Sequence, residues 1–534
     1  MKKLTFLFFA FGLLSSASYG QIAEGQIAFG GTQAEQATSI VQTRSGGYAT
    51  AGYTSSYGSG FYQVYVANFD SKGLLKWAKA IGGTGLDYGY GITQALDGGF
   101  VVTGYTNSFA TGIEDVYVIK LDSLGNIKWT ESIGGANAEQ GKCIITTKDG
   151  GYAIGGYTGS YGAGGPGDFY IIKLDASGAV KWTKTIGGGG DEEAYTIIQT
   201  KDGGYALSGY TLSFGAGNAD VYVAKVDSVG NLQWTRTVGG PLGDAGFGIC
   251  QTFDGGYAVT GYEAESSFGA GSDDMYVIRL DAGGAVRWTK TIGGTGNDQG
   301  QSILETKDRG LVVAGFTTSF GAGGFDVYLV KLDSLGNKLW DKATGGPGNE
   351  QAQALIQTAD HGFAVAGYSD NYGAGMDDFF LVKYDSAGNT CGSSEAAGGI
   401  VGTGGTYGTG GTASSGGTIN FKDSGRIVES GILDTICRTM RKPSAVENIS
   451  ANLGDVKVYP NPSSGKLNVD LSDITINTDL NLEITDITGR VLISTNVHNF
   501  DNVLTFDVSS FSPGMYFMRL SSGTASEVKK FIKE

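Results

Sequence analysis

Short apolar runs separated by polar turn residues follow one another along most of this chain. The stretch 82–133 is typical, because it holds the runs YGYGIT, FVVTGYT, DVYVIKL and IKWTESI between turns rich in Gly, Asp and Asn. Runs of four to eight residues with alternating apolar positions predict β-strands. The third run is apolar on both faces, as expected of a strand covered on both sides. Each such stretch therefore predicts a four-stranded sheet, and the chain is expected to be all-β.

The same unit occurs seven times, with a repeat length of 52 to 54 residues. A Gly-Gly pair marks each unit and begins at Gly30, Gly82, Gly134, Gly187, Gly239, Gly293 and Gly345. The first run ends in a DGG-type turn, where glycine supplies the positive φ of a tight hairpin. The second run carries a glycine at mid-strand, which permits the close approach of a neighbouring sheet.

One tryptophan stands at a fixed place in each of the first six units. These residues are Trp77, Trp129, Trp182, Trp234, Trp288 and Trp340. A regularly repeated aromatic is expected to fill the space between stacked sheets. Four strands in a unit of about 50 residues, copied seven times, predict a seven-bladed β-propeller.

The two ends of the repeat region provide a further indication. The seventh unit has no fourth run, because the chain reads NTCGSS after Gly388. The missing run lies at the other end, where EGQIAFGG at 24–31 aligns with KWTESIGG at 128–135. The N-terminal strand is therefore expected to complete the last blade and close the ring, so that no edge is left exposed.

Composition and the N-terminus indicate an exported protein. Residues 1–20 have Lys2 and Lys3, an apolar core from Leu4 to Leu14 and small residues up to Gly20, which predicts a signal peptide. No later segment approaches 18 apolar residues, so no membrane span is expected. The net charge of −16 argues against nucleic acid as a partner.

The four cysteines fall into two pairs. Cys143 and Cys250 lie inside apolar runs of different units and are expected to be buried thiols. Cys391 and Cys437 flank a Gly-rich stretch and are candidates for a disulfide in an oxidising compartment. Residues 392–417 have the composition of a flexible tether. The predicted organisation is a signal peptide at 1–20, a propeller at 21–390, a linker at 391–450 and a small β-sandwich at 451–534.

The C-terminal segment resembles the type A C-terminal sorting domain of the type IX secretion system. It has a Pro-Asn-Pro motif, Gly-centred turns and alternating apolar residues, which predict a small antiparallel sandwich. The matching residues are Tyr459, Pro460, Asn461, Pro462, Gly465, Asp486, Gly489, Arg490, Val491, Pro513, Gly514, Tyr516, Lys529 and Lys530. The resemblance implies export by that machinery, removal of the domain by its sortase, and attachment to a surface polysaccharide or release.

The repeat region resembles the DGGY-containing propeller repeats of secreted bacterial proteins. The motifs SxGAGxxDVYxIKxDSxGN and WxKTIGG carry this resemblance. That group has diverse functions, so the resemblance implies the fold and not an activity. The DSLGNIKW segment is also similar to the docking motif of quinoprotein propellers, but the vicinal cysteines of those enzymes are absent.

Carboxylates occur at two fixed places in the units. One stands five residues after each first glycine: Glu35, Asp87, Glu139, Glu192, Asp244, Asp298 and Glu350. A second set precedes the third run: Asp115, Asp168, Asp220, Asp274, Asp326 and Asp378, with Gln63 in the first unit. Both sets are expected on one face of the ring. Either each carboxylate caps its own loop, or the first set binds cations, for which Ca²⁺ is the best match to oxygen ligands.

No catalytic motif is present. GxSxG, HExxH, Walker and EF-hand patterns are absent, and His361 occupies a turn position. A residue copied in every unit is a poor catalyst candidate, so function is expected where the units differ: Gln63, Pro166, the loop 263–267, Arg309 and His361. The leading hypothesis is a secreted or surface-displayed binding or scaffold protein without cofactor, whose ligand is a glycan or an extracellular protein. The alternatives are a secreted polysaccharide-active enzyme and a structural adhesin.

Overall fold

The computed structural model describes residues 22–264, 269 and 271–391, seven short strands between 394 and 440, and 457–534 except 472–479, 487–490, 498–502 and 523–524. The described chain is all-β and contains no helix. It divides into two compact units, Met1–Arg441 and Lys442–Glu534. The predicted signal peptide, residues 1–20, lies outside the described residues.

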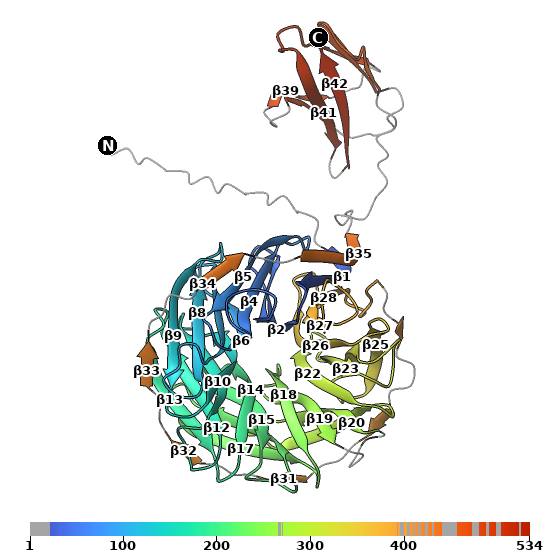
Figure 1. The fold of residues 1–534 in the computed structure, drawn as a ribbon. Coiled ribbons are helices and arrows are strands. Elements are labelled where there is room, and N and C mark those ends of the chain that lie inside the picture. The colour runs from blue at the N-terminus through green and yellow to red at the C-terminus, as the bar shows by residue number, and fades with distance from the viewer. Residues whose placement is uncertain are drawn as a thin grey trace, which may run out of the picture. The chain divides into compact units, whose positions relative to one another are not determined.

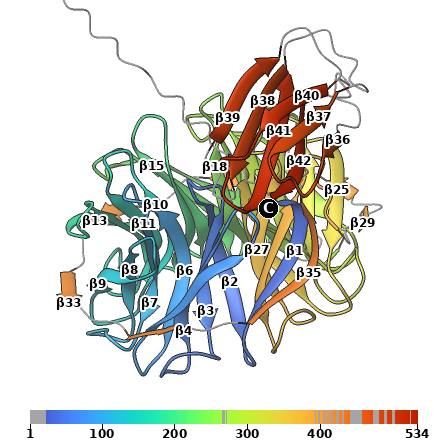
Figure 2. The same ribbon diagram turned by 90° about the horizontal axis from the view of Figure 1, so that it is seen from above.

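The first unit consists of seven sheets with one common connectivity (Figures 1 and 2). In each sheet, four consecutive strands pair antiparallel in sequence order.
The first three sheets contain β2 (Glu35–Gln42), β3 (Tyr48–Thr54), β4 (Gln63–Phe69) and β5 (Leu75–Gly82); β6 (Asp87–Gln94), β7 (Phe100–Thr106), β8 (Asp115–Leu121) and β9 (Ile127–Gly134); and β10 (Glu139–Thr146), β11 (Tyr152–Thr158), β12 (Asp168–Leu174) and β13 (Val180–Gly187).
The next three contain β14 (Glu192–Gln199), β15 (Tyr205–Thr211), β16 (Asp220–Val226) and β17 (Leu232–Gly239); β18 (Asp244–Gln251), β19 (Tyr257–Ala264), β20 (Asp273–Leu280) and β21 (Val286–Gly293); and β22 (Asp298–Glu305), β23 (Leu311–Thr317), β24 (Asp326–Leu332) and β25 (Lys338–Thr344).
The seventh contains β26 (Glu350–Gln357), β27 (Phe363–Ser369), β28 (Asp378–Tyr384) and β1 (Ile22–Gly30).

The N-terminal strand completes the seventh sheet, as the sequence predicts. Strand β1 pairs antiparallel with β28 in a register that sets Gly25 opposite Lys383 and Phe29 opposite Phe379. The seven sheets lie side by side around a central axis, and β2 of the first sheet contacts β27 and β28 of the last (Figure 1). The two ends of the repeat region thus meet within one sheet.

Neighbouring sheets are held together by apolar side chains from their third and second strands. Val66 of β4, for example, shares a buried cluster with Val102 of β7 and Tyr117 of β8. The tryptophans lie at these junctions, as predicted: Trp182 contacts Tyr205 of the next sheet with ring centres 5.9 Å apart, and Trp234 contacts Tyr257 at 5.5 Å. Because the third strands are covered on both faces, their side chains are buried at nearly every position.

A fifth strand is added to every sheet by the segment that the composition presented as a flexible tether. In chain order these strands are β29 (Ser394–Glu395), β30 (Ile400–Gly402), β31 (Thr406–Gly408), β32 (Thr412–Ser414), β33 (Thr418–Phe421), β34 (Arg426–Glu429) and β35 (Ile432–Met440). They pair with β25, β21, β17, β13, β9, β5 and β1, in that order. The segment therefore follows the outer rim of the ring backwards through all seven sheets (Figure 1), and we call it the strap.

The strap differs from the tether expectation for a physical reason. Each fourth strand has an outer edge with unpaired backbone groups, and an added strand satisfies them. Four consecutive strap strands begin at residues 400, 406, 412 and 418, so six residues carry the chain from one sheet to the next. The compact first unit consequently extends to Arg441 rather than ending at the boundary near 390 that composition indicates.

The cysteines follow the predicted division into two pairs as far as the described residues allow. Cys143 and Cys250 are free, and burial raises the pKa of each thiol to about 12. Cys391 is disulfide-bonded. The side chain of Cys437 lies outside the described residues, but its backbone lies opposite Gln26 in the β1–β35 ladder. The Gln26 amide donates a hydrogen bond to the carbonyl of Cys391, so the two ends of the strap approach the same strand.

The second compact unit is a pair of antiparallel sheets around one apolar core. One sheet contains β36 (Lys457–Tyr459), β37 (Lys466–Asp470) and β40 (Val503–Asp507), and the other contains β38 (Leu480–Asp486), β39 (Val491–Val497), β41 (Gly514–Ser522) and β42 (Ala525–Lys533). Leu467 and Val469 of the first sheet pack against Leu482, Met518 and Phe531 of the second. The predicted two-sheet arrangement of this segment is confirmed.

Candidate functional site

The two faces of the ring carry different connections. Loops between the second and third strands contact the loops that lead to the next sheet, as in the parallel bridges Tyr62–Leu86, Glu114–Ala138 and Gly167–Asp191. These loops define the loop face. Tight hairpin turns between the first and second strands, and between the third and fourth, define the opposite hairpin face. Both predicted carboxylate sets begin strands and lie on the loop face.

Every carboxylate of the first set caps its own loop. Each accepts a hydrogen bond from the amide of the second glycine of the Gly-Gly pair, as Gly83 donates to Asp87 at 2.7 Å and Gly188 to Glu192 at 2.6 Å. Side-chain hydroxyls add to this: Thr158 donates to Glu139 at 2.8 Å and Ser369 to Glu350 at 2.8 Å. The capping interpretation is confirmed.
The same glycine amide bond is made to Glu35, Glu139, Asp244, Asp298 and Glu350.

The second set also caps loops and lies close to the first. Asp168 accepts from the amide of Ala163 at 3.1 Å, and Asp378 accepts from Ala374 at 3.0 Å. Burial, reinforced by repulsion from Glu192, raises the pKa of Asp168 to about 6. Burial and Glu35 likewise raise the pKa of Asp378 to about 6. Burial raises that of Asp244 to about 7, with Asp220 as the nearest like charge.

The carboxylates do not converge on one point. Among the residues that the structure describes, no group of three or more His, Cys, Asp or Glu side chains is arranged to hold a metal ion. Each member of the first set is 0–1% exposed and accepts hydrogen bonds from its own loop, and these donors stabilise its charge. Cation binding by this set stays a prediction.

A pocket of about 410 Å³ lies at the centre of the loop face, and all seven first strands contribute to it. The contributing position is eight residues after each first glycine, where the side chains are Thr38, Tyr90, Lys142, Tyr195, Phe247, Gln301 and Gln353. Whereas every unit has a carboxylate, Asp or Glu, at the capping position, this position changes in chemical type from sheet to sheet. The pocket is therefore asymmetric within a symmetric frame.

Aromatic side chains line the pocket on five of its seven sheets. Tyr88 lies 4.6 Å from Tyr53 and 4.9 Å from Tyr105, measured between ring centres. In the fourth and fifth sheets, Tyr195 lies 5.0 Å from Phe247 in an edge-to-face arrangement. The second strands reinforce both groups, since an aromatic stands after the mid-strand glycine in every unit.
These residues are Tyr53, Tyr105, Tyr157, Tyr210, Tyr262, Phe316 and Tyr368.

Lys142 links the two aromatic groups. Its ammonium lies 4.4 Å from the ring centre of Tyr90 and forms an ion pair with Glu193 at 2.8 Å. Tyr195 approaches the same carboxylate, with its hydroxyl 3.3 Å from Glu193 Oε2. The Lys142 and Glu193 side chains are only 15% and 16% exposed, so this charge pair is largely withdrawn from water.

Amides and a hydroxyl line the pocket on the first, sixth and seventh sheets. Gln36, Thr38, Gln301 and Gln353 line it. The amide of Gln36 already donates to Asp377 at 2.8 Å, whereas the primary amides of Gln301 and Gln353 offer both donors and acceptors to hydroxyl groups. Aromatic faces beside neutral hydrogen-bonding groups suit a ligand that has one apolar and one hydroxyl-bearing face.

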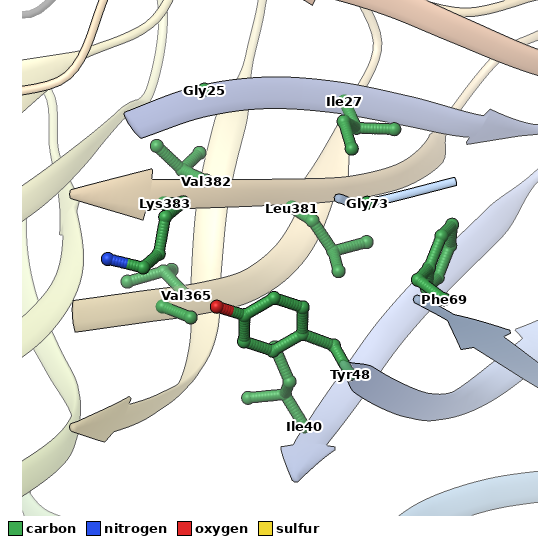
Figure 3. A pocket seen from close by; sticks show the side chains of 11 residues that line it. Gly25, Ile27, Ile40, Tyr48, Phe69, Gly73, Val365, Leu381, Val382 and Lys383 are labelled. Atoms are coloured by element: carbon green, nitrogen blue, oxygen red, sulfur yellow. The ribbon is translucent and has the colours of Figure 1, made fainter. Parts of the chain in front are cut away.

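A second small cavity lies at the seam between the first and last sheets (Figure 3). Figure 3 shows Ile27 of β1 and Leu381 of β28 facing Tyr48 and Ile40 of the first sheet. Its volume is about 20 Å³ and its walls are almost entirely apolar. A space that size holds about one water molecule, so this cavity is a packing gap at the closure of the ring and not a ligand site.

The predicted points of difference between units have separate locations. Gln63 is buried and donates to the carbonyl of Gly83 at 3.2 Å, whereas the aspartates at this position in other units accept hydrogen bonds from loop amides. His361 lies in a hairpin turn at φ 67°, as its sequence position predicts. Arg309 has the same turn conformation and lies on the hairpin face. Part of the loop 263–267 lies outside the described residues.

The residues of the central pocket escaped the sequence analysis. Each stands in a strand beside apolar positions, and no motif marks it. The available signal was the aligned position eight residues after each first glycine, where Thr, Tyr, Lys, Phe and Gln replace one another among otherwise similar units.

In the C-terminal unit, the Pro-Asn-Pro motif is tied to the last strand. Asn461 donates to the carbonyl of Lys530 at 3.1 Å and accepts from the amide of Ile532 at 2.9 Å. Tyr516 donates to the carbonyl of Ser512 at 2.7 Å and stacks on Phe531. Gly489 and Arg490 lie outside the described residues.

Residues 457–534 match the secretion system C-terminal sorting domain family. The chain is accordingly a type IX secretion substrate that is exported to the cell surface or the extracellular space. Within the described residues, no helix has the length and apolar character needed to cross a membrane.

Similarity elsewhere in the chain is limited. The chain is 26% identical over 208 residues to the regulatory protein FlaEY of Caulobacter vibrioides, covering 35% of this chain and 21% of that protein. It thus spans about a fifth of this curated relative. Among solved structures, the match to Sqt1 from Chaetomium thermophilum covers 72% of this chain and 91% of the Sqt1 chain, at 13% identity and a TM-score of 0.38. A tandem repeat of a large adhesion protein matches at 12% identity and a TM-score of 0.12.

Proposed function

We propose that this protein is a seven-bladed β-propeller that binds an extracellular carbohydrate in the central pocket of its loop face. The sorting domain supplies the route of export, and the propeller supplies the binding surface. The observation that carries the proposal is the variable position on the seven first strands. It places aromatic, amide, hydroxyl and ammonium side chains around one pocket of about 410 Å³.

The chemistry of the aromatic and amide side chains in the pocket supports a sugar as ligand. A pyranose ring has C–H groups on its faces and hydroxyls on its edge. Tyr195 and Phe247 offer flat, polarisable surfaces for the faces, and Gln301 and Gln353 offer paired donors and acceptors for the edge. The volume is within the usual range for small-ligand sites and suits one or two sugar rings.

Binding without cleavage is the form of the proposal that the charges favour. A glycosidase needs a free carboxylate and a second carboxyl group to act as acid and base. Glu193, a carboxylate beside the pocket, is paired with Lys142 at 2.8 Å. Burial raises the pKa of Asp191, and this residue accepts a hydrogen bond from Tyr210 at 2.8 Å. Both carboxylates are therefore already bound by neighbouring side chains.

A screen of the purified protein against an oligosaccharide panel tests the proposal. We expect at least one oligosaccharide to bind, with an affinity about tenfold or more lower for Tyr195→Ala than for the wild type. Phe61→Ala is the matched control, because Phe61 is 78% exposed and does not line the pocket. Absence of binding, or equal affinity of Tyr195→Ala, would contradict the proposal. Release of sugar from a bound polysaccharide would favour the enzyme alternative.

A further inference from the structure

Three arginines gather at one cavity of the hairpin face, between the fifth and sixth sheets. Arg279, Arg287 and Arg309 line a space of about 460 Å³ together with Phe253, Asp254 and Glu305. Phe253 and Arg309 lie in hairpin turns after first strands, so the cavity is on the face opposite the central pocket. The chain has a net charge of −16, which makes a cluster of three guanidinium groups unusual for its surface.

Two of the three arginines depart from the repeat pattern. Arg309 stands at a turn position that is glycine in five other units and adopts φ 67°, a conformation that side chains other than Asn and Asp seldom take. Those glycines are Gly46, Gly98, Gly150, Gly203 and Gly255. Arg279 stands where five other units have lysine: Lys120, Lys173, Lys225, Lys331 and Lys383. The fold requires neither arginine, because the equivalent turns form with glycine and the equivalent third strands form with lysine.

The acidic groups of the cavity already have partners. Asp254 pairs with Arg279 at 2.6 Å and with Arg287 at 3.4 Å. Glu305 accepts a hydrogen bond from the backbone amide of Phe253 at 2.5 Å. Three guanidinium groups against two carboxylates leave the lining of the cavity with a net charge of 3 − 2 = +1.

Arg309 is oriented by an aromatic ring and not by a carboxylate. Its guanidinium carbon lies 4.1 Å from the ring centre of Phe253, and among the described residues it forms no ion pair. Phe253 is 50% exposed, so part of its ring is accessible to a ligand. Lys201 approaches the same ring at 5.6 Å and extends the positive region toward the fourth sheet. The stacked guanidinium keeps its hydrogen-bonding edge available to a ligand.

We propose that this cavity binds the carboxylate or sulfate group of an anionic polysaccharide. The planar forks of Arg309 and Arg287 would hold the oxyanion, since guanidinium groups bind such anions with two parallel hydrogen bonds. Phe253 would contact the apolar face of the sugar that carries it. The cavity is a second site, independent of the central pocket, and together the two would let one ring engage a long polymer on both faces.

Isothermal titration of the full-length protein tests this site. The probes are an oligogalacturonate, which carries carboxylates, its methyl-esterified counterpart, which is uncharged, and a heparin-derived oligosaccharide, which carries sulfates. We expect one or both anionic probes to bind and the uncharged probe not to bind. Binding by only one anionic probe identifies which oxyanion the site accepts. Affinity should fall as salt is raised, because screening weakens charge pairs.

The variant that decides the matter is Arg309→Gly. It restores the residue that five units carry at this turn, so it is expected to fold at least as well as the wild type. It should bind the anionic probe about tenfold or more weakly, while His361→Gly, at the equivalent turn of the seventh unit, should bind unchanged. Failure of both anionic probes to bind, equal binding of the uncharged probe, or full affinity of Arg309→Gly would overturn the proposal. None of these results would affect the central pocket, whose test uses Tyr195→Ala.

Discussion

The ammonium of Lys142 lies 4.4 Å from the ring centre of Tyr90, a residue of the preceding sheet. This contact places a cation on an aromatic face at the centre of the ring, while Glu193 of the following sheet holds the same ammonium at 2.8 Å. Three successive sheets are thus joined through one side chain. The first prediction follows from this arrangement.

Lys142→Met is expected to destabilise the protein by about 1–3 kcal/mol, because it leaves the largely buried Glu193 carboxylate without its counter-charge. The double variant Lys142→Met with Glu193→Gln should recover part of this loss, since neither charge then remains. Urea unfolding followed by tryptophan fluorescence measures both. Equal stability of Lys142→Met and the wild type would show that solvent, and not Lys142, compensates Glu193.

Closure of the ring depends on the side chain of Phe29 in the N-terminal strand. Phe29 is fully buried and stacks on Tyr65 of the first sheet at 5.6 Å. Phe29→Ala should cost about 3–5 kcal/mol, the usual range for truncating a buried aromatic. Leu124→Ala is the control, because Leu124 is 70% exposed and should change stability by about 0.5 kcal/mol or less. Thermal unfolding of the two variants side by side tests the role of this strand, and similar melting temperatures would contradict it.

The raised carboxyl pKa values predict a protein that is more stable in mild acid. The pKa is about 6 for Asp168 and Asp378 and about 7 for Asp244, against about 3.9 in an unfolded chain. Between these values the folded state binds more protons than the unfolded state, so stability falls as pH rises from about 4 to about 7. The aspartates whose pKa is lowered by hydrogen bonds from threonine and lysine, such as Asp202 at about 2, lose their contribution only below that window.

Melting temperatures measured from pH 4.5 to 8 at constant ionic strength check this prediction. Asp244→Asn should flatten the decline, because the amide does not titrate. A melting temperature that rises steadily to pH 8 would show that these carboxyl groups are ionised in the folded state, with their charge compensated by a group or ion not considered above.

Calcium is expected to add little stability. Each carboxylate of the first set is already bonded to a glycine amide of its own loop, as Asp298 is to Gly294 at 2.7 Å. Millimolar CaCl₂ should therefore shift the melting temperature no more than MgCl₂ at equal concentration. A calcium-specific increase, together with heat in a calorimetric titration, would support cation binding by this set instead.

The strap is expected to keep the ring monomeric. A chain ending after residue 391, with Cys391→Ser to avoid a free thiol, would leave the fourth strands with unpaired outer edges, which favour association. A chain ending after residue 441 retains all seven strap strands and is the control. Size-exclusion chromatography with light scattering should find oligomers or aggregates for the shorter chain and monomers for the longer one. Monomers of equal melting temperature in both cases would show that the strap does not protect the edges.

The sequence by itself determined the strands, the sevenfold repeat and the exchange of the N-terminal strand into the last sheet. These features depend on local periodicity and on the alignment of units, as the pairing of Phe29 with Phe379 illustrates. It also indicated the two-sheet C-terminal unit, because alternating apolar residues and Gly-centred turns are local signals as well. Capping by residues such as Glu139 was one of two interpretations that the spacing left open.

Only the tertiary structure decided the central pocket, the arginine cavity and the strap. Tyr90, Lys142 and Tyr195 lie about fifty residues apart in the chain and meet because equivalent positions of successive sheets face one axis. Arg287 and Arg309 come together across a sheet junction in the same way. The strap has the composition of a tether, and its backbone becomes ordered because seven unpaired strand edges lie along its path. The composition of a segment indicates how it behaves in isolation, whereas an edge strand forms only when a neighbouring strand pairs with it.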